Sequence, residues 1–296
     1  MLADRLKQGD VIGVASPSHI ATWEGYTSVF EAMECMGFRT KAADNLYADS
    51  WGYSASPEER AADINQLIYD PEVKMIFFGG GEGADDLLPL IDYEAASKNP
   101  KLWLSYSDGT SILNTVWNKT GLTTYYGQAV GMLSGMSEYD WTQFDAHIMN
   151  LGGEHIPSGE WCTLTGGTAE GTLMGGYLDN FLHLLGCGWV KPRRNRQYVL
   201  FLEDNEQFFG IEHESVLLTR LEQSAVMKRA SGILFGHYSA PVNDALLERL
   251  YRLGTKWGIP VAYCDDFGHG ENHAILPIGA QARLDTEAHT MIYEYE

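Results

Sequence analysis

Short apolar runs alternate with helix-like segments through the first half of this sequence, and no other feature limits the possible folds as strongly. Buried strands are predicted at 11–15, 38–43 and 73–78, with helices at 24–36 and 58–69. The second helix follows a capping box, Ser56-Pro57-Glu58-Glu59, with proline at its first position. This alternation predicts an α/β fold with a mostly parallel sheet and helices on both faces.

The stretch around Ser107 places a serine on a sharp turn between a strand and a helix. Lys101–Leu104 is a fourth predicted strand, and apolar residues at helical spacing predict a helix from Ser111 onward. Such a turn lifts the Ser107 hydroxyl out of the fold and aims the first N–H groups of the helix at whatever the hydroxyl attacks. The alternative is that Ser107 or Asp108 simply caps the helix.

A glycine loop, Gly79–Gly83, follows the third strand, and a helix is predicted after it at Asp85–Ile91. The loop lacks both the Lys-Ser/Thr of a P-loop and the Rossmann spacing. Its N–H groups could instead face an anion or an oxyanion, or the loop could be only a tight turn. Ligands collect at the carboxyl ends of parallel strands, so we expect the loop and Ser107 to share one crevice.

A polar segment, 137–160, is interpreted as a linker or domain crossing. We therefore expect an N-terminal α/β domain at 1–150, which carries Ser107, and a smaller C-terminal α/β domain at 151–296 that is rich in β segments. Strands of the second domain are predicted at 198–202, 232–236 and 261–264, a helix at 212–227 and short β segments at 274–296.

Charge and composition exclude several classes of protein. The formal net charge of −20 repels nucleic acid and anionic lipid, so neither is expected as a partner. The sequence has no apolar run of 18 residues, and its N-terminus has no apolar signal region, so we expect neither a membrane span nor a secretory signal. The four cysteines are far apart and form no metal-type pair, which favours free thiols in a cytoplasmic protein.

Glu203 and His269 are the other candidate catalytic residues. Glu203 follows four apolar residues at a strand end, where a carboxylate can accept from an imidazole and stabilise the imidazolium; the alternative is an exposed acid. His269 lies in Asp265–His273, which is rich in possible metal ligands, but its glycines argue against a helix. A loop histidine suits proton transfer, or it could bond only to the backbone. The order Ser107, Glu203, His269 also occurs in α/β-hydrolases.

Several short motifs follow one another along nearly the whole chain. They are Gly9–Ser18, Gly52–Asp63, Gly80–Pro89, Tyr106–Asp108, Gly171–Gly176, Leu202–Asp204 and Phe267–His269. In this order they resemble the LD-carboxypeptidase and microcin C immunity family of serine peptidases.

The resemblance implies a serine hydrolase with two domains and the active site between them. It implies Ser107 as the nucleophile, His269 as general base and then acid, and Glu203 as the orienting carboxylate. The oxyanion would be held by the backbone N–H groups of Asp108 and Gly81. The resemblance further implies no cofactor and no metal, a small peptide or aminoacyl-nucleotide substrate, and a cytoplasmic homodimer.

The family carries two activities, and both remain open for this chain. The leading hypothesis is removal of the terminal D-alanine from murein tetrapeptide at an L,D bond, in peptidoglycan recycling. The alternative is microcin immunity, by cleavage of the amide in an aminoacyl-nucleotide. Residues 79–83 read Gly-Gly-Gly-Glu-Gly, where the murein type reads Arg-Gly-Gly-Tyr-Gly, and Tyr177 replaces a family Asn. Lys119–Gly127 and Asp266–His269 resemble the microcin branch more closely. A catalytically inactive two-domain binding protein is the hypothesis from another class.

Overall fold

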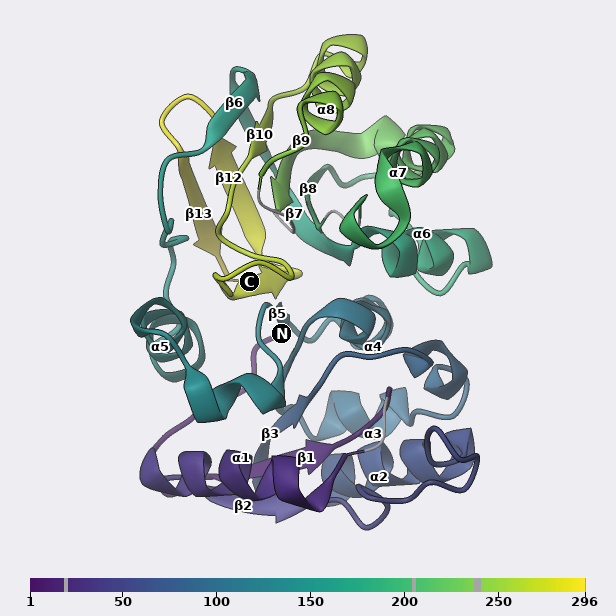
Figure 1. Cartoon of the computed structure of the whole chain (residues 1–296), viewed down its shortest axis with the longest axis vertical. Coiled ribbons are helices and arrows are strands. Elements are labelled where there is room, and N and C mark those ends of the chain that lie inside the picture. Colours follow the sequence, from purple (N-terminus) through teal and green to yellow (C-terminus); the bar gives the residue numbers. More distant parts are fainter. Residues whose placement is uncertain (19–20, 204–205, 237–240, 296) are drawn as a thin grey trace. The chain divides into compact units, whose positions relative to one another are not determined.

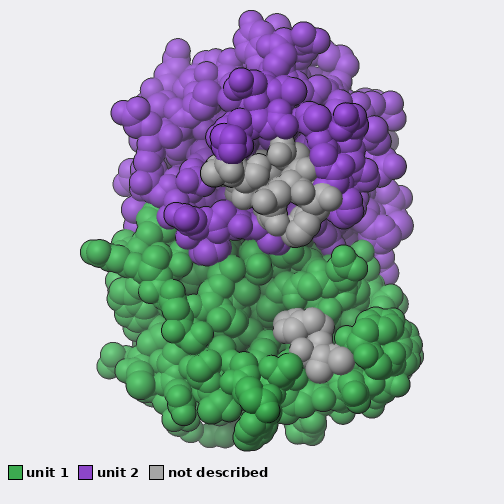
Figure 2. Space-filling view, in the orientation of Figure 1, with its two compact units in different colours: residues 1–151 green, residues 152–296 purple. Residues whose placement is uncertain are grey.

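The computed structural model describes residues 1–18, 21–203, 206–236 and 241–295. The chain forms two compact units, residues 1–151 (unit 1) and residues 152–296 (unit 2), which Figure 2 shows in different colours. Asp204, in the motif Leu202–Asp204, and Glu296, in the predicted β segments at 274–296, lie outside the described residues. Each unit contains a sheet with helices packed on it (Figure 1).

Unit 1 contains a parallel sheet in which its own strands follow the order β5-β4-β3-β1-β2. The strands are β1 (Val11–Ala15), β2 (Arg39–Ala42), β3 (Val73–Phe78), β4 (Leu102–Ser105) and β5 (Thr124–Tyr126). The helices are α1 (Trp23–Cys35), α2 (Pro57–Tyr69), α3 (Tyr93–Lys98) and α4 (Thr110–Thr120). The prediction of an α/β fold with a parallel sheet is confirmed.

The strand order reverses between β1 and β3. Because parallel crossovers are right-handed, α1 covers one face of the sheet and α2, α3 and α4, which pack on one another in turn, cover the other. Helices on both faces explain why β1 and β4 are buried along their whole length. A reversal of this kind opens a crevice at the carboxyl ends of the two strands. The turn after β1 and the glycine loop after β3 flank that position.

Helix α2 begins as its sequence predicts. The Ser56 hydroxyl accepts from the Glu59 N–H at 3.3 Å, and the Glu59 carboxylate accepts from the Ser56 N–H at 2.8 Å, which completes the capping box. The buried face of the helix includes Ile64 and Leu67, but also the charged Arg60.

One local prediction in unit 1, the helix at 85–91, is wrong. A second is met only in part, because the segment 137–160 contains the division between the two units, after residue 151, but begins with helical turns. Only a 3₁₀ turn, Ala84–Leu87, forms where a helix was expected over Asp85–Ile91, because Pro89 has no N–H to continue it. The expected linker at 137–160 begins with helix α5 (Glu138–Phe144) and a π-helix (Asp145–Met149). A capping box at Ser137 starts α5, and burial of Phe144 and Ile148 stabilises this pair of helical turns despite the polar sequence.

Unit 2 has a mixed sheet in the order β13-β12-β7-β8-β9-β10-β6. The four central strands, β7 to β10, are parallel, and the edge strands are antiparallel to their neighbours. The strands of unit 2 are β6 (Cys162–Thr165), β7 (Thr168–Tyr177), β8 (Tyr198–Glu203), β9 (Ala230–Gly236), β10 (Val261–Tyr263), β11 (Leu276–Ile278), β12 (Gln281–Asp285) and β13 (Thr290–Glu294). The helices are α6 (Leu178–Cys187), α7 (Glu206–Gln223) and α8 (Asp244–Trp257). The prediction of a β-rich second α/β half is confirmed.

No helix within the described ranges is both long enough and apolar enough to span a membrane.

Candidate active site

Ser107 lies just beyond the carboxyl end of β4, in a 3₁₀ turn (Ser107–Gly109) that leads into α4. Its φ angle is 54°, in the left-handed region that residues other than glycine rarely adopt. Such a conformation costs on the order of 1–3 kcal/mol and persists where the surroundings enforce it, often at functional sites. The Ser107 N–H donates to the Tyr126 hydroxyl at 3.0 Å, which helps to hold the turn.

Close contacts around Gly109 explain why glycine is needed on this turn. A Cβ atom at Gly109 would lie 2.2 Å from the Ser105 hydroxyl oxygen, too near for any side chain. Helix α4 has Gly109 at its N-cap, a residue with no side chain to cap the helix. The Asp108 carboxylate instead accepts from the Ala84 N–H at 2.8 Å.

The glycine loop and Ser107 do lie side by side. A Cβ atom at Gly80 would be 2.8 Å from Ser107 Cβ and 3.3 Å from its hydroxyl oxygen. Gly81 has a φ of 138°, and a Cβ there would meet the Ser18 carbonyl oxygen at 2.8 Å. Only glycine fits such a conformation and such an approach. Gly80 is therefore in direct contact with Ser107, and Gly81 follows it in the loop.

In unit 2 the structure brings Glu203 and His269 together. Glu203 ends β8 and is fully buried, so the alternative of an exposed acid is wrong. The His269 side chain is 15% exposed, and its Nδ1 is paired with Glu203 Oε1. A carboxylate accepts only, so Nδ1 carries the proton, and in the neutral ring Nε2 carries the lone pair.

The residues around this pair fix the loop that carries His269. The Phe267 ring packs edge-on against Phe201 at a centroid distance of 5.9 Å. A Cβ atom at Gly236, the last residue of β9, would lie 2.5 Å from the same ring. The Tyr177 ring, at the end of β7, is 5.2 Å from the His269 ring. His269 is thus held over the carboxyl ends of three neighbouring strands.

Asp266 is a fully buried carboxylate that the sequence analysis assigned no role beyond a motif. It accepts from His155 Nε2, from both the N–H and the hydroxyl of Ser158, each at 2.7 Å, and from Trp161 Nε1 at 2.6 Å. Burial raises the pKa of Asp266, but the hydrogen bonds from His155 and Ser158 outweigh burial and lower it overall. The carboxylate therefore anchors the His269 loop to the segment from 155 to 161.

The metal-site alternative for Asp265–His273 finds no support in this geometry. Within the described ranges, no group of three or more His, Cys, Asp or Glu side chains is arranged to hold a metal ion. Two of the potential ligands already have other partners: His269 is paired with Glu203, and Asp266 is paired with His155.

The candidate residues therefore fall into two sets, each assembled within its own unit. Ser107, Asp108 and Gly81 lie together in unit 1, and Glu203 and His269 lie together in unit 2. Arg60 and His155 had no role predicted from the sequence. A charged residue within the apolar stripe of a predicted helix was the available signal for Arg60, whereas nothing local marks His155.

These features define a two-unit α/β protein with a serine turn in one unit and a Glu–His pair in the other. A model of the LD-carboxypeptidase N-terminal domain matches residues 12–127, and a model of the LD-carboxypeptidase C-terminal domain matches residues 170–284. The chain belongs to the LD-carboxypeptidase family.

Relatives with both named activities are similar to the chain over nearly its full length. The microcin C7 self-immunity protein MccF of Escherichia coli is 27% identical, covering 96% of this chain and 93% of its own. A probable murein peptide carboxypeptidase of Bacillus subtilis is 27% identical, covering 98% and 93%. The solved structure of MccF in complex with aspartyl sulfamoyl adenosine has a TM-score of 0.87 at 26% identity, covering 100% of this chain and 99% of that one.

Proposed function

We propose that the protein is a serine-type peptidase or amidase that hydrolyses an amide bond near a carboxyl terminus. The observation that carries the proposal is the Glu203–His269 pair, in which a buried carboxylate binds Nδ1 and leaves Nε2 as the proton acceptor. The strained turn at Ser107 supplies the nucleophile expected to work with such a base.

In the proposed reaction His269 Nε2 takes the proton from the Ser107 hydroxyl as its oxygen attacks the substrate carbonyl. Glu203 stabilises the imidazolium that forms. His269 then gives the proton to the leaving nitrogen, the C–N bond breaks, and an acyl ester remains on Ser107. A water molecule, deprotonated by His269, then attacks the ester carbonyl. The C–O bond to Ser107 breaks, His269 returns the proton to the Ser107 oxygen, and the acid is released.

The oxyanion of each tetrahedral intermediate needs donors close to Ser107. The Ser107 N–H is already bonded to Tyr126, so it is a poor candidate. We assign the role to the N–H of Asp108, the next residue on the turn, and to that of Gly81, in the glycine loop beside Ser107.

Two substrates follow from the relatives. Murein tetrapeptide, cleaved at the L,D bond to D-alanine, is the first, because the family model is that of LD-carboxypeptidases and the Bacillus subtilis relative is named for murein peptide. An aminoacyl-nucleotide amide is the second. It is favoured by Gly79 and Glu82, which replace the Arg and Tyr of the murein-type loop, and by the nucleotide analogue in the MccF complex.

The test is release of D-alanine from murein tetrapeptide beside hydrolysis of aspartyl sulfamoyl adenosine, each with the parent protein and with Ser107→Ala. Turnover of either by the parent alone supports the serine mechanism and selects the substrate. Turnover that survives in Ser107→Ala contradicts it. Labelling by a fluorophosphonate that needs both Ser107 and His269 would argue against a protein that only binds.

A further inference from the structure

Arg60 is a buried cation in unit 1 that takes no part in the proposed chemistry. Its side chain is only 2% exposed, although it lies on α2 one turn before the core residue Ile64. A charge so deeply buried is tolerated only where its hydrogen-bonding groups are satisfied. The partners of Arg60 therefore show what this side chain holds in place.

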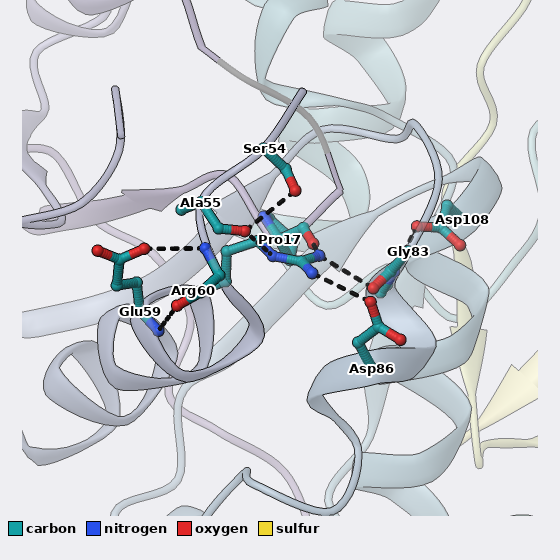
Figure 3. Close-up of polar contacts among 10 residues, drawn as sticks. Pro17, Ser54, Ala55, Glu59, Arg60, Gly83, Asp86 and Asp108 are labelled. Atoms are coloured by element: carbon teal, nitrogen blue, oxygen red, sulfur yellow. Dashed lines mark hydrogen bonds and ion pairs between the residues drawn. The ribbon is translucent and has the colours of Figure 1, made fainter. Parts of the chain in front are cut away.

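The guanidinium group donates to three backbone carbonyls on three different segments, which Figure 3 shows converging on it. Nε donates to Ala55 at 3.0 Å, and Nη1 donates both to Pro17 and, at 3.0 Å, to Gly83. Nη2 also contacts the Asp86 carboxylate at 3.2 Å. Ala55 precedes α2, Pro17 lies in the turn after β1, and Gly83 ends the glycine loop.

The turn after β1 and the glycine loop also contact each other directly. The Ser18 carbonyl accepts from the Glu82 N–H at 3.2 Å, and it lies 2.8 Å from the position of a Cβ on Gly81. Arg60 thus fastens two segments that meet where the strand order reverses between β1 and β3.

The glycine loop is fastened on its other side to the nucleophile turn. The Asp108 carboxylate accepts from Ala84, immediately after the loop, at 2.8 Å. Gly80, near the start of the loop, is in contact with Ser107. Arg60 binds the Gly83 carbonyl at the end of the same short loop, so its bonds restrict where the Gly81 N–H can lie relative to Ser107.

We propose that Arg60 is a positioning residue that holds the Gly80–Gly81 peptide beside Ser107 and so sets the geometry in which the oxyanion is bound. The inference rests on the proposed function, in which the Gly81 N–H is an oxyanion donor. A guanidinium suits this task because its planar fork offers five N–H donors in fixed directions, whereas a lysine ammonium is a compact charge with three donors on a flexible stem.

The first experiment measures amide hydrogen exchange in residues 79–84 of Arg60→Lys and Arg60→Met. The lysine variant keeps the buried charge, which protects the fold, and loses the fork. We expect exchange in the loop to be about tenfold faster or more, because the variants lose the bonds that hold the loop, while exchange in β3 stays unchanged. The control is Arg249→Lys in unit 2, where Arg249 pairs with Glu222 at 2.7 Å.

The second experiment measures the rate at which a fluorophosphonate labels Ser107, with Ser107→Ala as the blank. This probe needs no knowledge of the natural substrate. We expect the maximal rate in Arg60→Lys to fall on the order of 10- to 100-fold, because small displacements of oxyanion donors are costly, while the half-saturating concentration stays the same. Asp86→Asn should keep the parent rate, because the Asp86 side chain is half exposed.

Unchanged loop exchange in both Arg60 variants overturns the inference, and so does faster exchange with an unchanged labelling rate. A reduced labelling rate in Asp86→Asn would show that the ion pair, rather than the bonds to the carbonyls, is responsible for the effect. That result would also overturn the inference. A parent protein whose Ser107 is never labelled counts against the proposed function instead. In that case the exchange comparison alone decides whether Arg60 holds the loop.

Discussion

Both units fasten a candidate functional loop with a buried charge, but the two charges have opposite signs. In unit 1, Arg60 donates to the carbonyls of three segments around the glycine loop. In unit 2, Asp266 accepts four hydrogen bonds from His155, Ser158 and Trp161 and so anchors the loop of His269.

The sign of each charge follows from the hydrogen-bonding groups that it must bind. A cation binds carbonyl oxygens of the glycine loop. The N–H groups of the loop then remain to face an anion. The anion in unit 2 takes up N–H and O–H donors of a neighbouring segment, and the loop it anchors presents an imidazole. The pKa of the Asp266 carboxyl is lowered overall by this arrangement, so the anchor of unit 2 can be tested by pH.

The largest expected effect tests whether the two sets of residues act together. Ser107→Ala and His269→Ala should each lower kcat on the order of 10⁴-fold or more, and the double variant should lose no more than either single one. The measurement is steady-state hydrolysis of whichever substrate the parent turns over. Losses that multiply in the double variant would mean that the two units contribute independently.

The second effect is on stability and concerns the anchor of unit 2. Asp266→Asn should lower the free energy of unfolding by about 3 kcal/mol, because it removes the charge from a buried, fully bonded group beside His155. Urea unfolding followed by fluorescence measures it. Asp265→Asn, at the exposed neighbouring position, is the matched control and should change little. An equal loss of unfolding free energy in both variants would show that Asp266 does not anchor the loop.

The third effect is the pH dependence of that anchor. The folded pKa of Asp266 is lowered, after burial, by its bonds from His155 and Ser158, so its stabilising effect is full above the ordinary aspartate value of about 4. It is lost as the pH falls through the lower folded pKa. The gap in unfolding free energy between parent and Asp266→Asn should therefore shrink towards about pH 3. A difference in unfolding free energy that stays constant with pH would contradict the lowering of the Asp266 pKa.

The smallest effect concerns Asp63, a buried carboxylate in unit 1 whose pKa is shifted in the opposite direction, upward. Burial raises its pKa despite hydrogen bonds from Asn45, so its ionisation costs stability as the pH rises through the folded pKa. Asp63→Asn should leave stability at neutral pH unchanged or higher by less than about 1 kcal/mol. Its gain over the parent should grow with pH in the same urea experiments. A large loss at neutral pH would show that Asp63 stabilises as an anion.

Local patterns predicted the elements that local interactions create. The capping box at Ser56 and the apolar spacing of α2 are read from neighbouring residues, and α2 forms where they predict it. The same reasoning failed at 85–91, where one proline outweighs the apolar pattern. It also missed the helical turns at 138–149, which burial of Phe144 and Ile148 stabilises in a polar segment.

The alternation of strands and helices, the glycine loop, Ser107 and Glu203 at strand ends and the loop position of His269 could all be predicted from local sequence, because they depend on residues within a few positions of one another. The bonds of Arg60 to Pro17 and Gly83, and of Asp266 to His155, became visible only in the folded chain. These contacts join residues 23 to 111 positions apart. The pairing of buried polar groups depends on which segments the sheet topology brings into contact, and no local pattern contains that information.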